Sequence, residues 1–587
     1  MKPSASTQRL LPVRRVQIWY AFIVIVLAIC LIRVFYLQII QHEHYKTAAQ
    51  SDQYKEYEIN APRGTISAYD GDRTVPIVLN QTLYTVYADP QLVKDIDKTA
   101  AKVHEVLGGD IDKYKESMSA DNRYQVLAKQ VPEDKKEALL KAKMPGIGAQ
   151  AQDYRTYPQG VLAAQLLGFV DDSGEGRYGI EEALNKKMTG TPGQLKAVTD
   201  INGVPLAASP DNIRKKPVPG QNVILTIDIG MQKQVEQLLK QGLDDAKSES
   251  GSVVVMDPRT GAIKAMANYP TFNPADYTEV ADASVFNNAA VTDALEVGSV
   301  MKPLTAAAAI DMGVIKPNST FYDNRKIEID DSTVRNIEED GGAGEKSVTD
   351  ILNLSLNTGA TWLLQQMGGG ELNRKGRVAW YNYMTDRYLF GKPTGIEQGY
   401  EASGSVPSPT SGYGLNITYA NTSFGQAMTA TMVQMAGAYS AMLNGGTYYQ
   451  PRLVDATVDG SGKLTPVKPK VLKRGVVSPQ VSEDLQAMLE YVVDNHSFSR
   501  KFDKAYSVGG KTGTAQIADR ENGGYLTDEY NGTYVGFVGG DDAEYIIAVK
   551  VDRPKIAGYA GSRAAQPLFG NVAHMLIDNF NVTTKTR

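Results

Sequence analysis

A long uncharged apolar run near the N-terminus restricts how this chain can fold. Residues 16–32 read VQIWYAFIVIVLAICLI, and after Arg33 the apolar character continues to Ile40. Seventeen uncharged residues lie at the short end of a membrane span. Arg33 can extend that span, because its guanidinium reaches the interface while its methylenes stay in the apolar layer. We therefore predict a single transmembrane helix over residues 16–40.

The charges before this run predict its orientation. Residues 1–15 contain no acidic side chain and four basic ones, Lys2, Arg9, Arg14 and Arg15. By the positive-inside rule, this tail lies in the cytoplasm and everything after position 40 lies outside. The alternative is a cleaved signal peptide, which requires a shorter apolar core and then a cleavage site of small residues. The following sequence, RVFYLQIIQHEHY, contains no such site.

Composition argues against several classes of function. The 587 residues are enough for several domains, and the net charge of −5 is spread over intermixed basic and acidic residues. A nucleic-acid-binding protein would instead show a clustered basic excess. The single cysteine, Cys30, permits neither an intramolecular disulfide nor a cysteine-based metal site. None of the five histidines neighbours a recognisable motif, so we expect no metal and no cofactor.

The part after the anchor divides at a Pro/Gly-rich stretch, KKPVPGQNV at 215–223. Residues 41–217 mix short strands, helices and turns, and a second domain extends over 218–587. In that domain NVILTID predicts a strand, GMQKQVEQLLKQGLDDAK an amphipathic helix, and GSVVVMDPRTGAIKAMA two strands joined by a turn. TYVGFVGG and EYIIAVKVD predict paired strands. We expect a sheet covered by helices, with the first and last strands of the domain in one sheet.

The first of three short motifs is Ser299-Val300-Met301-Lys302, followed by PLTAAAAIDMG. The alanine-rich run predicts a helix, and Pro303 is tolerated only near its start, where amide donors have no intrahelical partner. Ser299 then lies at the positive end of the helix dipole, and Lys302 returns to the same face within reach of its hydroxyl. A serine beside a lysine kept neutral by burial is a workable nucleophile and base. Taken alone, the pattern also fits an exposed helix start with a solvated lysine.

Each of the other two motifs, taken alone, is weaker evidence for catalysis. Ser355-Leu356-Asn357 offers a hydroxyl that can relay a proton and an amide that can hold a substrate amide, although turns and helix caps use the same residues. Lys511-Thr512-Gly513-Thr514 predicts a strand that presents a cation and a hydroxyl to a carboxylate, with Gly513 letting a ligand approach the backbone. The rival interpretation, a phosphate-binding loop, needs glycine where the chain has Ala505.

Together and in this order, the motifs resemble those of the penicillin-binding proteins, serine acyltransferases of the bacterial cell wall. EVGSVMKPLT, NLSLNTGA and VGGKTGTAQ are similar to the class B form, as are APRGTIS and GRYGIEEALNKKMTGTPG before them. Val297, where the family commonly has proline, and SAYDGDR depart from its pattern outside the motifs. The resemblance implies an α+β fold: a transmembrane helix over 16–40, an elongated non-catalytic pedestal over 41–217, and a transpeptidase domain over 218–587 with a central antiparallel sheet flanked by helices.

The resemblance implies catalytic roles for four residues. Ser299 would attack the penultimate D-Ala carbonyl of a peptidoglycan stem peptide and expel D-Ala, with Lys302 taking its proton. Ser355 would pass a proton to the leaving amine, and Asn357 would orient the substrate amide. An amine from a neighbouring stem peptide would then resolve the acyl-enzyme and complete the cross-link. β-Lactams would acylate the same serine.

The third motif is implied to bind the donor substrate. Lys511 and Thr512 would hold its terminal carboxylate, with Gly513 and Thr514 beside them on the same strand. The backbone N–H groups of Ser299 and Thr514 would form the oxyanion hole.

The resemblance is closest to a class B protein, because residues 41–217 show no glycosyltransferase signature of the bifunctional class A form. LIRVFYLQIIQHEHY and TVYADPQLV resemble division-specific members more than elongation-specific ones. We therefore expect septal cross-linking at the cell membrane, in partnership with a membrane glycan polymerase and divisome proteins. An elongation-specific transpeptidase is the alternative.

Two other classes of function compete with this interpretation. In a hydrolase, a D,D-carboxypeptidase or a β-lactamase, water would resolve the acyl-enzyme, and the uncleaved anchor and pedestal disfavour it. A non-enzymatic β-lactam sensor would show HExxH and several spans, and a scaffold would have lost motif residues. All three motifs are intact in this sequence.

Overall fold

The computed structural model describes residues 13–46, 54–198, 213–337, 341–496, 502–519 and 524–586. Its internal contacts divide the chain into two compact units, Met1–Ala61 with Thr191–Val218, and Pro62–Gly190 with Pro219–Arg587. All three motifs belong to the second unit.

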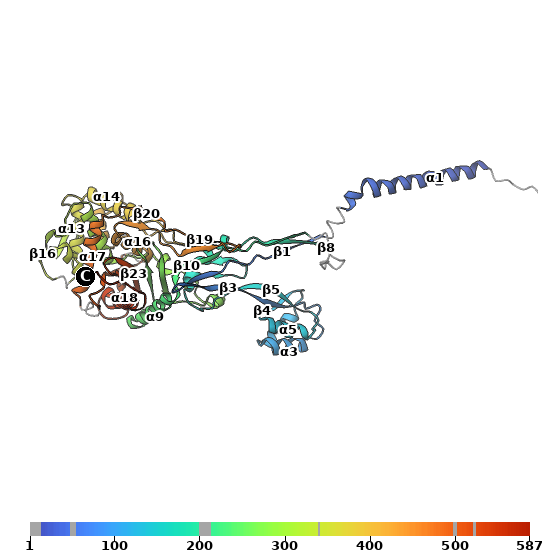
Figure 1. Cartoon of the computed structure of the whole chain (residues 1–587), viewed down its shortest axis with the longest axis horizontal. Helices are drawn as coiled ribbons and strands as arrows, with labels where there is room; N and C mark the ends of the chain where they lie inside the picture. Colours follow the sequence, from blue (N-terminus) through green and yellow to red (C-terminus); the bar gives the residue numbers. More distant parts are fainter. Residues whose placement is uncertain are drawn as a thin grey trace, which may run out of the picture. The chain divides into compact units, whose positions relative to one another are not determined.

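The first unit contains the predicted apolar helix. Helix α1 (Val13–Phe35) continues through one π-helical turn, η1 (Tyr36–Ile40), and the 25-residue segment Val16–Ile40 is long and apolar enough to cross a membrane (Figure 1). The helix predicted over 16–40 is confirmed. The same unit contains a three-stranded antiparallel sheet with β8 in its centre, formed by β1 (Tyr54–Ile59), β8 (Gly193–Val198) and β9 (Ile213–Lys215).

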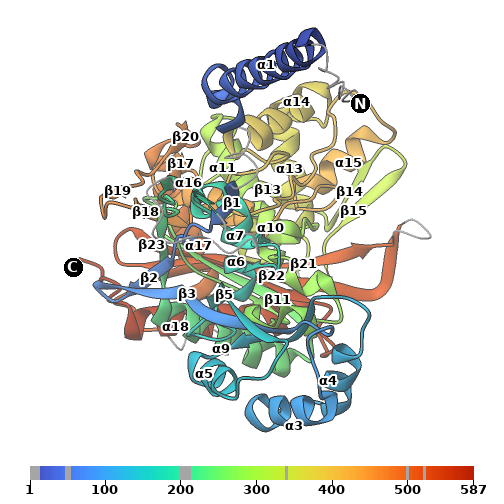
Figure 2. The same ribbon diagram turned by 90° about the vertical axis from the view of Figure 1, so that its right-hand side faces the viewer.

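The second unit contains two large sheets, and the first of them has seven strands. Its order is β19-β18-β10-β2-β3-β4, with β5 also paired to the long strand β3. Three short helices group with β3, β4 and β5 around a small apolar core (Figures 1 and 2). The strands are β2 (Ile66–Asp70), β3 (Arg73–Ala88), β4 (Gln125–Val131), β5 (Ile147–Thr156), β10 (Asn222–Asp228), β18 (Val454–Val458) and β19 (Leu464–Pro466), and the helices are α3 (Ile96–Leu107), α4 (Ile111–Met118) and α5 (Glu133–Lys141).

The partners of β10 correct one prediction from the sequence. Strand β10 is parallel to β2 and antiparallel to β18 in this sheet, so the first and last strands of the second domain do not share a sheet. The chain leaves β10 directly into helix α9 (Ile229–Ala246), which packs on the other sheet. This seven-stranded sheet therefore combines strands from both sides of the boundary predicted between 217 and 218.

The second sheet is the predicted central antiparallel sheet. Its order is β12-β11-β23-β22-β21, and every neighbouring pair is antiparallel. The turn predicted between β11 and β12 is confirmed. The predicted pairing of β22 with β23 is also confirmed. The strands are β11 (Ser250–Met256), β12 (Ile263–Tyr269), β21 (Ser507–Ala518), β22 (Tyr525–Gly539) and β23 (Ala543–Asp552).

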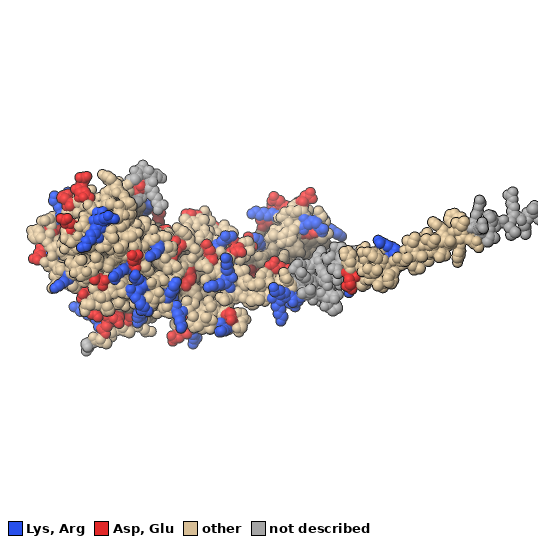
Figure 3. All heavy atoms as spheres, turned by 90° about the horizontal axis from the view of Figure 1, so that it is seen from above, with Lys and Arg blue, Asp and Glu red and all other residues tan. Residues whose placement is uncertain are grey.

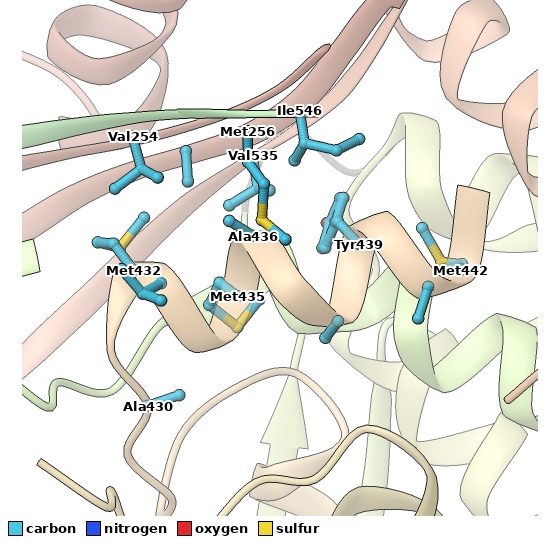
Figure 4. Close-up of a cluster of buried hydrophobic side chains, with 14 of the residues drawn as sticks. Val254, Met256, Ala430, Met432, Met435, Ala436, Tyr439, Met442, Val535 and Ile546 are labelled. Carbon is cyan, nitrogen blue, oxygen red and sulfur yellow. The ribbon is translucent and has the colours of Figure 1, made fainter. Parts of the chain in front are cut away.

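Helices cover both faces of this central sheet. Alternate side chains of a strand point to opposite faces, so Val253 and Val255 join one apolar cluster and Val254 and Met256 another. Helices α9 and α18 (Gln566–Asn579) bury the first face. Helix α16 (Met432–Leu443) lies against the second face, where Figure 4 shows its side chains among those of β11, β22 and β23.

Helix α11 (Lys302–Asp311) runs inside that second layer and is buried on all sides. Residues 302–309 are all buried, as expected only for a helix in the middle of a core. Two tyrosine hydroxyls donate to backbone carbonyls in and just before the helix: Tyr439 to Val300 at 2.6 Å and Tyr388 to Leu304 at 2.9 Å. The N-terminus of α11 is therefore held rigidly within the domain.

The surface in Figure 3 shows basic and acidic side chains interspersed over the visible face. That distribution agrees with the mixed charge pattern noted in the sequence and differs from a continuous basic footprint.

Candidate active site

Ser299 lies in a tight turn at the start of the buried helix. A 3₁₀ turn, η4 (Gly298–Met301), precedes α11, and Pro303 is the second residue of the α-helix, as predicted. Gly298 has φ +68°, a left-handed conformation, and a Cβ there would come within 2.8 Å of the Thr514 carbonyl oxygen. Glycine is thus required next to the serine, because the turn packs directly on the strand that carries the third motif.

Lys302 is completely buried, and its amine is directed at the second motif. Nζ donates to Ser355 O at 2.5 Å, to Ser355 Oγ at 3.1 Å and to Asn357 Oδ1 at 2.8 Å. The hydrogen bond from Lys302 to the Ser299 hydroxyl that the spacing predicted is not formed. Burial, and next the charge of Lys511, lower the pKa of Lys302 well below its usual value. The amine is therefore suited to accept a proton.

Ser355 and Asn357 occupy the junction between α12 (Val348–Asn353) and α13 (Asn357–Met367). Ser355 has φ +55°, an unfavourable backbone conformation for a residue with a side chain. Asn357 is the first residue of α13, where its backbone N–H has no intrahelical acceptor. The strained turn brings the carbonyl and hydroxyl of Ser355 to one side of the Lys302 amine.

A hairpin that the sequence analysis did not single out holds the second motif in place. It consists of β14 (Lys326–Ile329) and β15 (Ser332–Arg335). Asn357 Nδ2 donates to Arg335 O at 3.0 Å, which leaves its Oδ1 facing Lys302. Asn336 Oδ1 accepts from both the N–H and the hydroxyl of Thr358, and its Nδ2 donates to Asp323 at 2.8 Å. No short motif marks Asn336, because its partners lie 13 and 22 positions away.

The third motif lies on β21, the edge strand of the central sheet. Lys511 is only 2% exposed, and its Nζ donates to the carbonyl (3.1 Å) and hydroxyl (3.2 Å) of Thr512. Burial lowers the pKa of Lys511 to about 7. The Thr514 hydroxyl accepts from Gly561 N at 3.0 Å and so anchors the turn before α18.

Gly513 packs closely against the loop that leads to Ser299. A Cβ at this position would lie 2.2 Å from Thr533 Oγ1 and 2.7 Å from Val297 O. Thr533 in turn donates to Val297 O at 2.8 Å. The space that a Cβ would need is therefore filled by Thr533 and by the loop that leads to Ser299, so glycine is required here for close packing within the protein.

A second contact between the serine loop and its surroundings involves Glu296, three residues before Ser299. Its carboxylate accepts from Ala427 N at 3.0 Å and from the Tyr525 hydroxyl at 3.2 Å. Burial raises the pKa of Glu296, and burial together with this carboxylate raises the pKa of Tyr525 to about 12. The tyrosine thus remains a hydrogen-bond donor and ties the start of β22 to the loop.

The structure therefore brings the three predicted motifs together. Hydrogen bonds join Lys302 to Ser355 and Asn357, and backbone packing joins the serine turn to Thr514. The result is a partly exposed serine, a fully buried amine and a strand-borne lysine around one site. Such a site can supply a nucleophile, a neutral base and a cation to a carboxylate-bearing substrate.

Comparison with known proteins identifies the family. Residues 251–574 match the penicillin-binding protein transpeptidase domain, and residues 58–225 match the penicillin-binding protein dimerisation domain. Stage V sporulation protein D of Bacillus subtilis is 30% identical over 94% of this chain and 83% of its own length. The peptidoglycan D,D-transpeptidase FtsI of Escherichia coli is 26% identical over 95% of this chain and 91% of its own.

A solved structure agrees in fold along nearly the whole chain. Penicillin-binding protein 3 of Mycobacterium tuberculosis, complexed with aztreonam, superposes with a TM-score of 0.67 at 26% identity, covering 90% of this chain and 98% of that one. The family implied by the three motifs and the α+β fold expected from it are both confirmed. The chain belongs to the penicillin-binding protein transpeptidase family, as a class B member in which a dimerisation domain precedes the transpeptidase domain.

Proposed function

We propose that this protein cross-links septal peptidoglycan as a serine D,D-transpeptidase anchored in the cell membrane. Membership of the transpeptidase family supports the reaction class. The observation that carries the residue assignment is the buried Lys302 amine, held by Ser355 and Asn357 one helical turn from Ser299.

In the proposed mechanism, Lys302 accepts the hydroxyl proton as Ser299 Oγ attacks the penultimate D-Ala carbonyl. The tetrahedral oxyanion is stabilised by the backbone N–H groups of Ser299 and Thr514. Ser355 relays a proton to the nitrogen of the departing D-Ala, and the C–N bond breaks to leave a serine ester. The amine of a second stem peptide then attacks the ester, losing a proton as the new amide forms and Ser299 regains its hydrogen.

Substrate positioning is assigned to the remaining motif residues. Asn357 orients the amide of the donor peptide, while Lys511 and Thr512 bind its terminal carboxylate. Gly513 and Thr514 lie on the same strand, and close packing at Gly513 supports a fixed distance between this strand and the serine turn. β-Lactams that carry a carboxylate would use the same contacts and acylate Ser299.

The cellular arrangement is also a proposal. Residues 1–15 lie in the cytoplasm, 16–40 cross the membrane, 41–217 form the pedestal and 218–587 carry out the reaction outside the cell. The positive residues before the span support this orientation. The anchor and pedestal would contact a membrane glycan polymerase and other divisome proteins.

Labelling with a fluorescent penicillin tests the nucleophile and its base. We expect Ser299→Ala to abolish covalent labelling, because no other group would form the ester. Lys302→Ala should slow acylation by a factor of about 10² or more, since it removes the general base. Gel fluorescence measures the label, and circular dichroism checks that each variant is folded. Persistent labelling of Ser299→Ala would overturn the assignment.

The pKa of Lys511 predicts how acylation depends on pH. With a pKa of about 7, Lys511 loses its proton as the pH rises through 7. The second-order rate constant for a carboxylate-bearing β-lactam should therefore fall above pH 7, approaching about tenfold per pH unit. Lys511→Arg keeps its charge at all these pH values, so its profile should lose this descending limb, whatever its absolute rate. An unchanged limb in that variant would show that another group titrates.

The contact between Asn336 and Thr358 predicts that a substitution outside the three motifs slows acylation. Asn336→Ala removes the acceptor of Thr358 and should slow acylation about tenfold, because loss of these part-buried hydrogen bonds, worth about 1–3 kcal/mol, loosens the start of α13. Thr333→Ala is the matched control, since Thr333 lies in the same hairpin and bonds only the exposed Glu328. Stopped-flow acylation measures both variants. Equal acylation rates in Asn336→Ala and Thr333→Ala would show that Asn336 does not position the second motif.

Depletion in the native bacterium distinguishes septal from elongation-specific synthesis. Loss of a septal transpeptidase blocks division while growth continues, so we expect filaments under the microscope. Rounded cells would instead favour the elongation-specific alternative.

A further inference from the structure

A row of polar and small residues crosses all five strands of the central sheet. The residues lie directly opposite one another on neighbouring strands, so their side chains point to the same face. Val254, Val535 and Ile546 in Figure 4 belong to this face, which is the one that contacts α16. The row, which we call the cross-sheet row, consists of Asn268 on β12, Ser252 on β11, Lys550 on β23, Thr533 on β22 and Gly513 on β21.

Residues 289–297, which we call the crossing segment, lead to the serine turn and contact this row at both ends. At the start, Ala290 N donates to Asn268 Oδ1 at 3.0 Å. At the end, Val297 O accepts from the Thr533 hydroxyl at 2.8 Å. These two contacts lie on the first and fourth strands of the sheet, so the crossing segment runs across the strands between them.

Lys550 contacts the middle of the crossing segment. Its side chain is only 3% exposed, and its Nζ donates to Asp293 Oδ2 and pairs with Asp552 Oδ1, each at 3.1 Å. Burial alone would lower the pKa of Lys550, but the carboxylates of Asp552 and Asp293 raise it above its usual value. The charged form of the amine is therefore favoured, unlike that of Lys302.

The two carboxylates around Lys550 differ in what they join. Asp552 belongs to the same strand and also accepts from Ser250 Oγ at 2.9 Å, so the sheet itself supplies one counter-charge. Asp293 comes from the crossing segment, and its side chain is 55% exposed. Loss of Asp293 would leave Lys550 paired with Asp552, so neutralising the buried charge does not depend on Asp293. The contact with Asp293 instead ties the crossing segment to the sheet.

We propose that Lys550 is a positioning residue for acylation: through Asp293 it fixes the crossing segment on the central sheet and so places Ser299 against β21. The inference rests on the proposed function of Ser299 as the nucleophile, which lies six residues after Asp293. Attack depends closely on the position of the nucleophile, and a misplacement of about 1 Å can slow a reaction about 10²-fold. Lys550 touches neither the substrate nor the reacting atoms in this account.

Stopped-flow acylation of the full chain in detergent micelles tests the proposal, with a carboxylate-bearing β-lactam as the probe. We expect Asp293→Asn to lower the maximal acylation rate constant about three- to tenfold, because the serine is less well placed. The apparent dissociation constant of the β-lactam should change less than about twofold, since Lys511 and Thr512 are untouched. Lys550→Met should give the same pattern, and Asp293→Glu, which keeps the carboxylate, should recover most of the rate.

Ser252→Ala is the matched control. Ser252 is buried in the same row directly opposite Lys550, but its hydroxyl has no hydrogen-bond partner among the described residues. The variant should therefore acylate at the parental rate. An equal loss of rate in Ser252→Ala and Asp293→Asn would overturn the proposal, because any change in the row would then have the same effect.

Hydrogen exchange separates this inference from the proposed function, because it does not depend on acylation. Leu295 N donates to Ala430 O at 3.1 Å and Gly298 N to Gly425 O at 3.0 Å, so both amides report on the segment that Asp293 holds. Their exchange should be about threefold or more faster in Asp293→Asn than in the parent, and unchanged in Ser252→Ala.

Asp293→Asn decides the proposal even if Lys550→Met does not fold, because Asp293 is half exposed. Parental exchange in Asp293→Asn, or a parental acylation rate, would overturn the positioning role of Lys550. Faster exchange in a chain that β-lactams do not acylate would support the positioning of the segment and refute the proposed function instead.

Discussion

The burial of the Lys302 amine is the constraint on which the rest of the site depends. An unpaired ammonium ion in a core is highly unfavourable, so burial favours the neutral form of the amine and makes internal hydrogen-bond partners necessary. Ser355 and Asn357 place three oxygen atoms within 3.1 Å of the Lys302 nitrogen. The positive φ of Ser355 is the conformational cost of placing two of those acceptors on one residue. The second motif is thus a structural requirement of the first.

The same constraint explains the packing around α11. A reactive group in the core keeps its position only if the helix that bears it cannot shift, and protein interiors resist displacement because they are close-packed. Residues 302–309 are all buried, and buried tyrosine hydroxyls donate to the carbonyls of Val300 and Leu304. The central sheet approaches the serine turn through Gly298 and Gly513, where any side chain would collide with backbone or with Thr533. Tight packing therefore fixes the distance between nucleophile and strand.

A buried cluster of ion pairs stabilises the seven-stranded sheet of the second unit. Glu181 is fully buried between Arg63 and Arg155, with nitrogen–oxygen distances of 2.6 and 2.7 Å. Arg155 also donates to Asn80 at 2.6 Å, so this group joins β3 and β5 to α7 (Gly179–Ala183). Removal of one partner from such a group leaves an uncompensated buried charge, which makes it a strong determinant of local geometry.

Local sequence patterns determined the elements of this protein. Apolar length predicted the span over 16–40, and Pro303 with its alanine run predicted the start of α11. The recurrence of Val235, Leu238, Leu239 and Leu243 predicted α9, in which all but Leu238 are buried. These signals lie within a few residues of one another, so secondary-structure periodicity suffices to read them. The three motifs, taken together, resembled those of one family, and the comparison with known proteins confirmed that family.

Only the tertiary structure decided which elements meet. The partners of β10 come from positions 66–69 and 454–458, and the acceptors of Lys302 lie 53 and 55 residues away. The hydrogen bonds of Asn336 and the close packing at Gly513 likewise depend on contacts between distant segments. Periodicity records which face of an element is buried, but not what it is buried against, because many apolar or polar partners satisfy the same face equally well.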